Sequence, residues 1–166
     1  MRVILFFDQI QAGLGGKERA DTPLGLEKGA IGSSLMFKDY LRAQGVQIVA
    51  TVYCGTAYFK AHRQEVIAKI KRLIEKTQTE CLLGGPCFNY ADYIEMACEV
   101  GVAVQSETCR AYVVCADEGP ELIARYCNQL LMTRMPKKGG TGLSQALQQM
   151  EQIIGTQALT SDAIYR

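Results

Sequence analysis

Short apolar runs alternate along this chain with longer stretches of helical periodicity, and this alternation limits the fold more than any other feature. The first run, residues 3–7, is apolar at every position, which is typical of a strand buried on both faces. The clearest helical stretch, residues 59–76, carries one apolar stripe opposite a charged side. Further strand-like runs occur at residues 46–53, 80–83, 111–116 and 130–133. Strands that alternate with helices predict a parallel sheet with helices on both faces.

Five such units in 166 residues predict a three-layer α/β/α sandwich with about five parallel strands, doubly wound and flavodoxin-like. We expect a single α/β domain over residues 1–155, followed by a carboxyl-terminal tail at 156–166. Residues 9–32 form a long polar connection rich in glycine, predicted to be irregular, and a loop of that length in a compact domain is usually functional. The expected helices run from Ser33 or Ser34 to Gln44, over 59–76, over 90–106, from near Pro120, and from Thr141 or Ser144 to near Gly155.

The charge and hydropathy of the chain argue against two classes of partner. Eighteen basic and seventeen acidic residues leave a net charge of +1, so nothing indicates nucleic acid or an anionic membrane as a partner. The longest apolar runs are far shorter than the ~20 residues that a membrane-spanning helix needs. Met1 and Arg2 lead straight into a strand-like run rather than into a secretory signal. We therefore expect a cytoplasmic protein with no membrane or nucleic-acid partner.

Seven cysteines are an unusually high number for a chain of this length. In a cytoplasmic protein they are expected to be thiols rather than disulfides. No two of them are spaced as Cys-x-x-Cys, and His62 is the only histidine, so we predict neither a zinc site nor any other metal or cofactor. Most of the seven are expected to be small residues of the core.

Ligands of a doubly wound sheet bind beyond the carboxyl ends of its strands, so the residues that follow each strand are the candidates for binding. Glycines are frequent there, and a glycine allows a backbone to approach a ligand closely. A turn cap explains Asp8 equally well, and a solvated turn explains residues 137–142. The candidate ligand-binding residues are Asp8, Gln9, Gly13, Gly15, Gly16, Gly55, Gly85, Asn89, Gly140 and Thr141.

Three cysteines are candidates for catalysis. Cys54 and Cys87 each follow a predicted strand and precede a helix, where backbone N–H groups can depress the pKa of a thiol. The alternative for both is a thiol that only fills space in the core. Cys98 lies within a predicted helix, where it would be a resolving thiol or a core residue.

Four stretches of the sequence resemble one known family. They are Gln-x-x-Ala-Gly-Leu-Gly-Gly-Lys-Glu-x-Ala-Asp at 9–21, Ala-Thr-Val-x-Cys-Gly-x-x-Tyr-Phe at 50–59, Gly-Pro-x-Phe-Asn-x-x-x-Tyr at 85–93 continuing to Ala97-Cys98, and Gly-Gly-Thr-Gly at 139–142. In this order they resemble the amino-terminal domain of the selenoprotein B subunit of the glycine, sarcosine and betaine reductases. By matching position, the resemblance points to Cys54, Gly55, Asn89 and Cys98.

The resemblance implies an oxidoreductase that uses a disulfide as acceptor, or a subunit of such a complex. Members of that family act on a small amine substrate held by a pyruvoyl-containing partner subunit, and a thioredoxin-type dithiol supplies the electrons. The selenocysteine of the family lies in a second domain, and the present sequence contains none. The partners implied are therefore other reductase subunits and a small amine or carboxylate substrate.

Three functions follow from these observations. In the first, Cys54 or Cys87 attacks a substrate whose carboxylate is held by Asn89 and the glycine-rich loop. In the second, the chain is a non-catalytic binding or assembly subunit with a ligand edge, and another chain supplies the chemistry. A nucleotide-binding, flavodoxin-like domain ranks last, because no loop with phosphate-binding hydroxyls follows the first strand. The sequence leaves open whether the chain forms a homo-oligomer.

Overall fold

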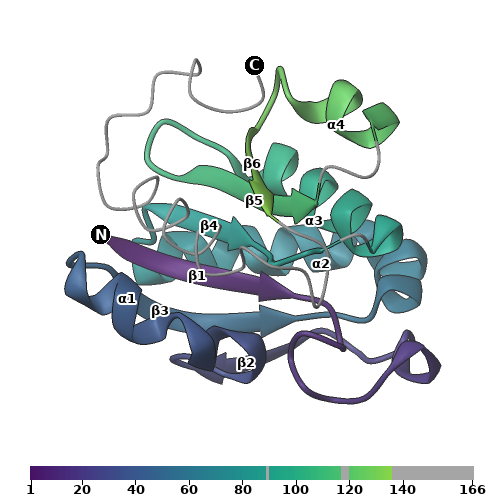
Figure 1. Cartoon of the computed structure of the whole chain (residues 1–166), viewed down its shortest axis with the longest axis horizontal. Coiled ribbons are helices and arrows are strands. Elements are labelled where there is room, and N and C mark those ends of the chain that lie inside the picture. Colours follow the sequence, from purple (N-terminus) through teal and green to yellow (C-terminus); the bar gives the residue numbers. More distant parts are fainter. Residues whose placement is uncertain (89, 117–119, 136–166) are drawn as a thin grey trace.

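The computed structural model describes residues 1–88, 90–116 and 120–135. Within them, six strands form one sheet in the order β2-β3-β1-β4-β5-β6 (Figure 1). Five of these strands pair in parallel, and β2 pairs antiparallel to β3 at one edge. The strands are β1 (Arg2–Phe7), β2 (Gly25–Lys28), β3 (Gln47–Tyr53), β4 (Cys81–Gly84), β5 (Arg110–Ala116) and β6 (Leu131–Met135).

Helices cover both faces of the sheet, which confirms the predicted three-layer sandwich (Figure 1). Alternate residues of β1 face opposite sides: Phe6 packs in the cluster that includes α2 and α3, whereas Leu5 packs with Leu41 of α1. No helix within the described ranges is long and apolar enough to cross a membrane. The α-helices are α1 (Lys38–Ala43), α2 (Thr56–Thr77), α3 (Ala91–Val104) and α4 (Pro120–Tyr126).

The strand order has a direct consequence for where a ligand can bind. Counted along the chain, the five parallel strands β3-β1-β4-β5-β6 have the order 2-1-3-4-5, which is that of a flavodoxin-like sheet. The chain first adds a strand on one side of β1 and then crosses over to add β4 on the other side. Such a reversal leaves a crevice beyond the carboxyl ends of the strands that flank it.

The structure corrects the expectation for residues 9–32. This segment is not irregular throughout, because it contains a 3-10 turn, η1 (Lys17–Arg19), and the edge strand β2. Three of the four residues of β2 are exposed, so the strand carries no apolar run that would indicate it in the sequence. The strand is defined by its pairing with β3, which is a tertiary contact.

The first predicted helix is also divided. It consists of a 3-10 helix, η2 (Gly32–Met36), and then α1, and Phe37 between them has φ −128° and ψ −1°, outside the helical region. Helix α2 begins at Thr56, earlier than expected, directly after its N-cap residue Gly55. The expected last helix and the tail at 156–166 lie outside the described residues.

Candidate functional site

A cleft of about 400 Å³ lies at the carboxyl edge of the sheet. Its walls are the residues that follow β1, the turn at η1, and the first residues of α2 and α3. These segments follow β1, β3 and β4, so the cleft occupies the crevice that the strand order predicts. The lining residues are Asp8, Gln9, Ile10, Lys17, Ala20, Thr56, Tyr90, Ala91, Asp92 and Tyr93.

Asp8 closes the turn after β1 and lines the cleft at the same time. Its Oδ1 accepts a hydrogen bond of 2.7 Å from the backbone N–H of Gln11, and its backbone carbonyl accepts one of 3.0 Å from Ala12. The side chain is almost fully buried. Its negative charge contributes, after burial and neighbouring thiols, to raising the pKa of Cys87. Asp8 thus gives the cleft a negative wall.

Gln9, the next residue, also lines the cleft and has a buried acceptor oxygen. The residue is only 3% exposed, and its Nε2 donates a long hydrogen bond of 3.3 Å to the carbonyl of Gly16. Its Oε1 has no hydrogen-bond partner, and no other buried side-chain nitrogen or oxygen in the described part of the chain lacks one. A buried acceptor without a donor costs free energy, so Gln9 is the most unusual polar group of the cleft.

The cleft also has positive groups in its lining. Lys17 of η1 lines it, and no described residue forms an ion pair with this ammonium group. The first turn of α3, a helix of 14 residues, also faces the cleft and brings the positive end of its dipole. Asp92 in that turn is exposed and pairs with Lys60 at 3.0 Å. The cleft can therefore hold a ligand that carries both a negative group and a hydrogen-bond donor.

The predicted glycines position the cleft but do not line it. Gly55 is the clearest case, because a Cβ at this position would lie 2.2 Å from the carbonyl oxygen of Ala20. That oxygen accepts hydrogen bonds from the backbone N–H groups of Ala57 and Tyr58, so the segment that follows β1 is held against the start of α2. The other predicted glycines in the described ranges, Gly13, Gly15, Gly16 and Gly85, do not line the cleft either. Asn89, Gly140 and Thr141 lie outside the described residues.

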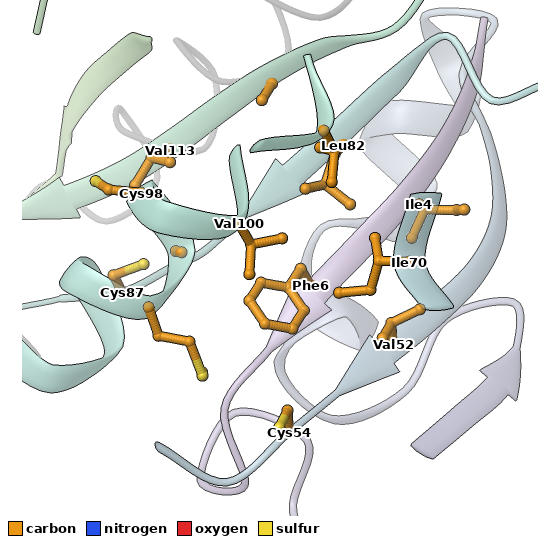
Figure 2. Packing of buried hydrophobic residues seen from close by; sticks show 14 of the residues in the cluster. Ile4, Phe6, Val52, Cys54, Ile70, Leu82, Cys87, Cys98, Val100 and Val113 are labelled. Atoms are coloured by element: carbon orange, nitrogen blue, oxygen red, sulfur yellow. The ribbon is translucent and has the colours of Figure 1, made fainter. Parts of the chain in front are cut away.

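The three candidate thiols are buried in the apolar cluster on one face of the sheet, and none of them lines the cleft (Figure 2). Burial raises the pKa of Cys54 to about 12. The pKa values of Cys87 and Cys98 are also raised, mainly by burial and further by the neighbouring thiol of Cys115. The lowered pKa expected from the helix N-termini is not found, because loss of solvent outweighs it. A chemical role for these thiols stays a prediction.

Sequence reasoning missed most of the residues that line the cleft. It identified Asp8 and Gln9 from their position after a strand, but not Lys17, Thr56 or the start of α3. Lys17 belongs to the glycine-rich stretch that carries the resemblance, which was a usable signal. Its place beside α2 and α3 depends on how residues 9–24 fold back, which no local pattern encodes.

A larger hollow of about 590 Å³ lies at the opposite edge of the sheet, near the ends of α2 and α3. The carboxyl ends of helices carry the negative end of the dipole, and no unpartnered buried side-chain polar atom within the described ranges lies there. Volume alone would favour this hollow, but polar chemistry favours the cleft at the carboxyl edge.

Comparison with known proteins decides the family. The model of the glycine/sarcosine/betaine reductase selenoprotein B family matches residues 1–164. This chain belongs to that family. The resemblance carried by the glycine-rich stretches is thereby confirmed.

Individual relatives agree with this assignment. The chain is 32% identical over 130 residues to the glycine reductase complex component B subunit gamma of Symbiobacterium thermophilum, covering 76% of this chain and 30% of the relative. It is 27% identical over 107 residues to the sarcosine reductase complex component B subunit beta of Peptoclostridium acidaminophilum, covering 64% and 24%. The betaine reductase complex component B subunit beta of that organism is 25% identical over 92 residues, covering 55% and 21%. The chain thus spans less than a third of the length of these curated relatives. No solved structure matches the chain.

Proposed function

We propose that this chain is a subunit of a cytoplasmic reductase complex of the glycine, sarcosine and betaine type, and that it binds a small amine-bearing carboxylate in the cleft at the carboxyl edge. In this proposal it is the binding subunit, and another polypeptide supplies the group that reacts. The observation that carries it is the contrast between a polar cleft and three thiols sealed in the core.

The chemistry of the cleft supports this class of ligand. The names of the relatives refer to glycine, sarcosine and betaine, which are small carboxylates that carry an amine or ammonium nitrogen. A carboxylate is stabilised by Lys17 and by the positive end of α3. A cationic nitrogen is stabilised by Asp8.

The proposed partners follow from the same assignment, in which this chain binds the ligand and another polypeptide reacts with it. A thiol with a pKa of about 12 is protonated at neutral pH and is a poor nucleophile, which supports assigning the supply of electrons to another subunit. We propose that a thioredoxin-type reductant and a pyruvoyl-type subunit of the complex perform these steps.

Capture of the complex tests the assignment. The tagged chain, expressed in the organism that encodes it, is expected to bring down subunits of a reductase complex identified by mass spectrometry. The purified complex should consume a dithiol in the presence of glycine, sarcosine or betaine. Absence of any reductase subunit from the captured proteins, with the chain folded, would contradict the proposal.

Substitutions in the complex separate binding from thiol catalysis. Lys17→Met should lower kcat/KM about two- to fivefold, the effect of one exposed ionic contact, whereas the exposed Lys38→Met on α1 should not change it. Cys54→Ser should leave kcat unchanged in protein that remains folded. If Cys54→Ser abolishes turnover without unfolding the chain, the thiol-based function replaces the one proposed here.

A further inference from the structure

Three large apolar side chains are exposed within one short segment of the chain. Leu35 and Met36 belong to η2 and Tyr40 belongs to α1, and their exposed fractions are 55%, 52% and 51%. The other exposed large apolar residues in the described part of the chain, Leu14 and Leu26, lie in separate segments. Exposed apolar residues that occur singly are ordinary, whereas a group of them marks an interaction surface. Leu35, Met36 and Tyr40 are the η2–α1 patch.

The core of the protein does not require these three side chains. The same segment supplies Phe37 and Leu41 to the apolar cluster beneath it, and both are fully buried. These two residues are one helical turn apart, since the backbone N–H of Leu41 donates to the carbonyl of Phe37 at 3.1 Å. They account for the inward side of the segment. Polar residues at the exposed positions would serve the fold equally well, so the fold alone does not explain the patch.

The two faces of the molecule differ in how their outer surfaces are built. Helix α1 covers one face of the sheet, and α2 and α3 cover the other (Figure 1). Each of the four ion pairs among the described residues joins side chains of α2, α3 or α4. The outer side of these helices is thus charged and internally paired, as on a surface that faces water. The segment of η2 and α1 instead presents apolar groups, so this side is the one suited to a partner.

Hydrogen bonds connect the segment that carries the patch to the cleft. The backbone N–H of Ser33, in η2, donates to the carbonyl of Gln11 at 2.9 Å. The N–H of Gln11 in turn donates to Oδ1 of Asp8 at 2.7 Å, and Asp8 lines the cleft. Since Asp8 and Gln11 follow β1, the start of η2 lies at the carboxyl edge of the sheet. A protein seated on the patch would therefore lie near that edge.

The relatives indicate which kind of partner covers the patch. They are named as subunits of glycine, sarcosine and betaine reductase complexes. The chain covers 30%, 24% and 21% of their lengths, so in each relative the matched region shares a polypeptide with more than twice as much further sequence. Because the matched region is one domain, the further sequence forms at least one more, and domains of one polypeptide share an interface.

We propose that the η2–α1 patch binds a domain equivalent to the one that the relatives carry beyond the matched region. The inference rests on the function proposed above, because it takes the reductase complex as the setting. The surface that binds Leu35, Met36 and Tyr40 is apolar. Binding there brings the second domain to the carboxyl edge of the sheet, near the cleft.

Charged substitutions in the patch test the inference in the complex captured with the tagged full chain. Leu35→Asp and Tyr40→Asp each place a carboxylate in the proposed interface, so the captured amount of the partner subunit should fall about tenfold or more. Leu26→Asp is the matched control, because Leu26 is 51% exposed on β2, and it should leave capture unchanged. Circular dichroism and the urea midpoint check that each variant folds. Leu35→Ser, with a smaller expected loss, replaces a variant that does not.

A photo-reactive side chain identifies what covers the patch. We expect p-benzoylphenylalanine in place of Tyr40, irradiated in the captured complex, to cross-link to a subunit whose sequence resembles the part of the relatives beyond the matched region. The same photo-reactive residue in place of Leu26 should not cross-link to that subunit. Mass spectrometry of the cross-linked peptides gives the identity of the partner and the segment that is bound.

The possible outcomes are separable. Unchanged capture by Leu35→Asp and Tyr40→Asp, or an equal loss with Leu26→Asp, overturns the inference. A cross-link from position 40 to residues 136–166 of the same chain, to a second copy of the chain or to a subunit of unrelated sequence also overturns it. Capture of reductase subunits that every variant retains leaves the proposed function standing. Absence of all reductase subunits with the unchanged, folded chain contradicts the proposed function and removes the partner proposed here.

Discussion

Cys54 illustrates how a residue's position along a strand decides its chemistry. It follows β3 directly, and alternate residues of that strand, Ala50 and Val52, point into the same apolar cluster. The period of two continues to Cys54 and turns its thiol into the core (Figure 2). The sequence shows both that Cys54 lies close to the start of α2 and that it continues this alternation. Only the alternation determines the environment of the thiol.

The buried thiols are expected to resist alkylation. Burial keeps the pKa of Cys54 at about 12, and those of Cys87 and Cys98 are also raised, so the reactive thiolate is scarce below pH 9 and grows only as the pH rises further. Peptide mass spectrometry after iodoacetamide treatment of native protein should show these three labelled last. Cys127 is half-buried and should be labelled first. Rapid labelling of Cys54 near pH 7 would contradict this, and unfolded protein, in which all seven react, is the control.

Tyr93 contributes stability through one buried hydrogen bond. Its ring is fully buried, and its hydroxyl donates to the backbone carbonyl of Phe6 at 2.6 Å. Tyr93→Phe should lower the free energy of unfolding by about 1–3 kcal/mol, measured by urea denaturation. Tyr40→Phe, at an exposed position on α1, should change it by less than about 0.5 kcal/mol. Equal effects of the two substitutions would show that the buried bond is not stabilising.

At the scale of elements, the apolar pattern of the sequence predicted the strands and helices that are stabilised by burial. It did not predict the elements that are defined by their pairing or packing with distant parts of the chain. Four of the five parallel strands have clear apolar runs and the run at β6 is weaker, but each strand was predicted within a few residues of its bounds. Strand β2 was missed because its residues are mostly exposed and its register is imposed by β3. The division of the first helix at Phe37 is equally a result of packing, since this side chain is fully buried in the cluster with α1.

The junction between the first connection and α2 should be intolerant of a single methyl group. Gly55 has an ordinary φ of −66°, so Gly55→Ala adds no backbone strain but places a Cβ 2.2 Å from the Ala20 carbonyl oxygen. We expect a loss of about 3 kcal/mol in the free energy of unfolding. Gly45→Ala is the control: φ is +77° with no atom within 4 Å, so only the left-handed conformation costs, about 1–2 kcal/mol. An equal or larger loss at Gly45 would contradict the steric explanation.

At the scale of the whole molecule, the location of the cleft was predictable and its composition was not. The strand alternation alone placed a ligand edge beyond the carboxyl ends, and it brought Asp8 and Gln9 to that edge. Lys17, Thr56 and Tyr90 join them because three separate segments converge in space. Convergence of this kind depends on strand order, which an apolar pattern does not contain.

Strand order also predicts how the molecule opens. β1 lies between β3 and β4 and is buried at nearly every position, whereas β2 is mostly exposed and, among the described strands, pairs only with β3. Hydrogen exchange followed by mass spectrometry should therefore find the amides of β1 protected close to the global stability, and those of β2 exchanging much sooner. Comparable protection of both strands would indicate that the edge opens only with the whole sheet.

The central place of β1 has a consequence for how the chain is made. Its neighbours come much later in the sequence, since Arg2 pairs with Gln47 and Val3 with Cys81. At roughly 5–20 residues per second, a ribosome needs about 4 to 16 s to go from β1 to β4. During that interval the most apolar segment of the nascent chain has no strand to pair with on one side. Of the strands in this sheet, β1 is thus the one that most needs shielding until its neighbours have been made.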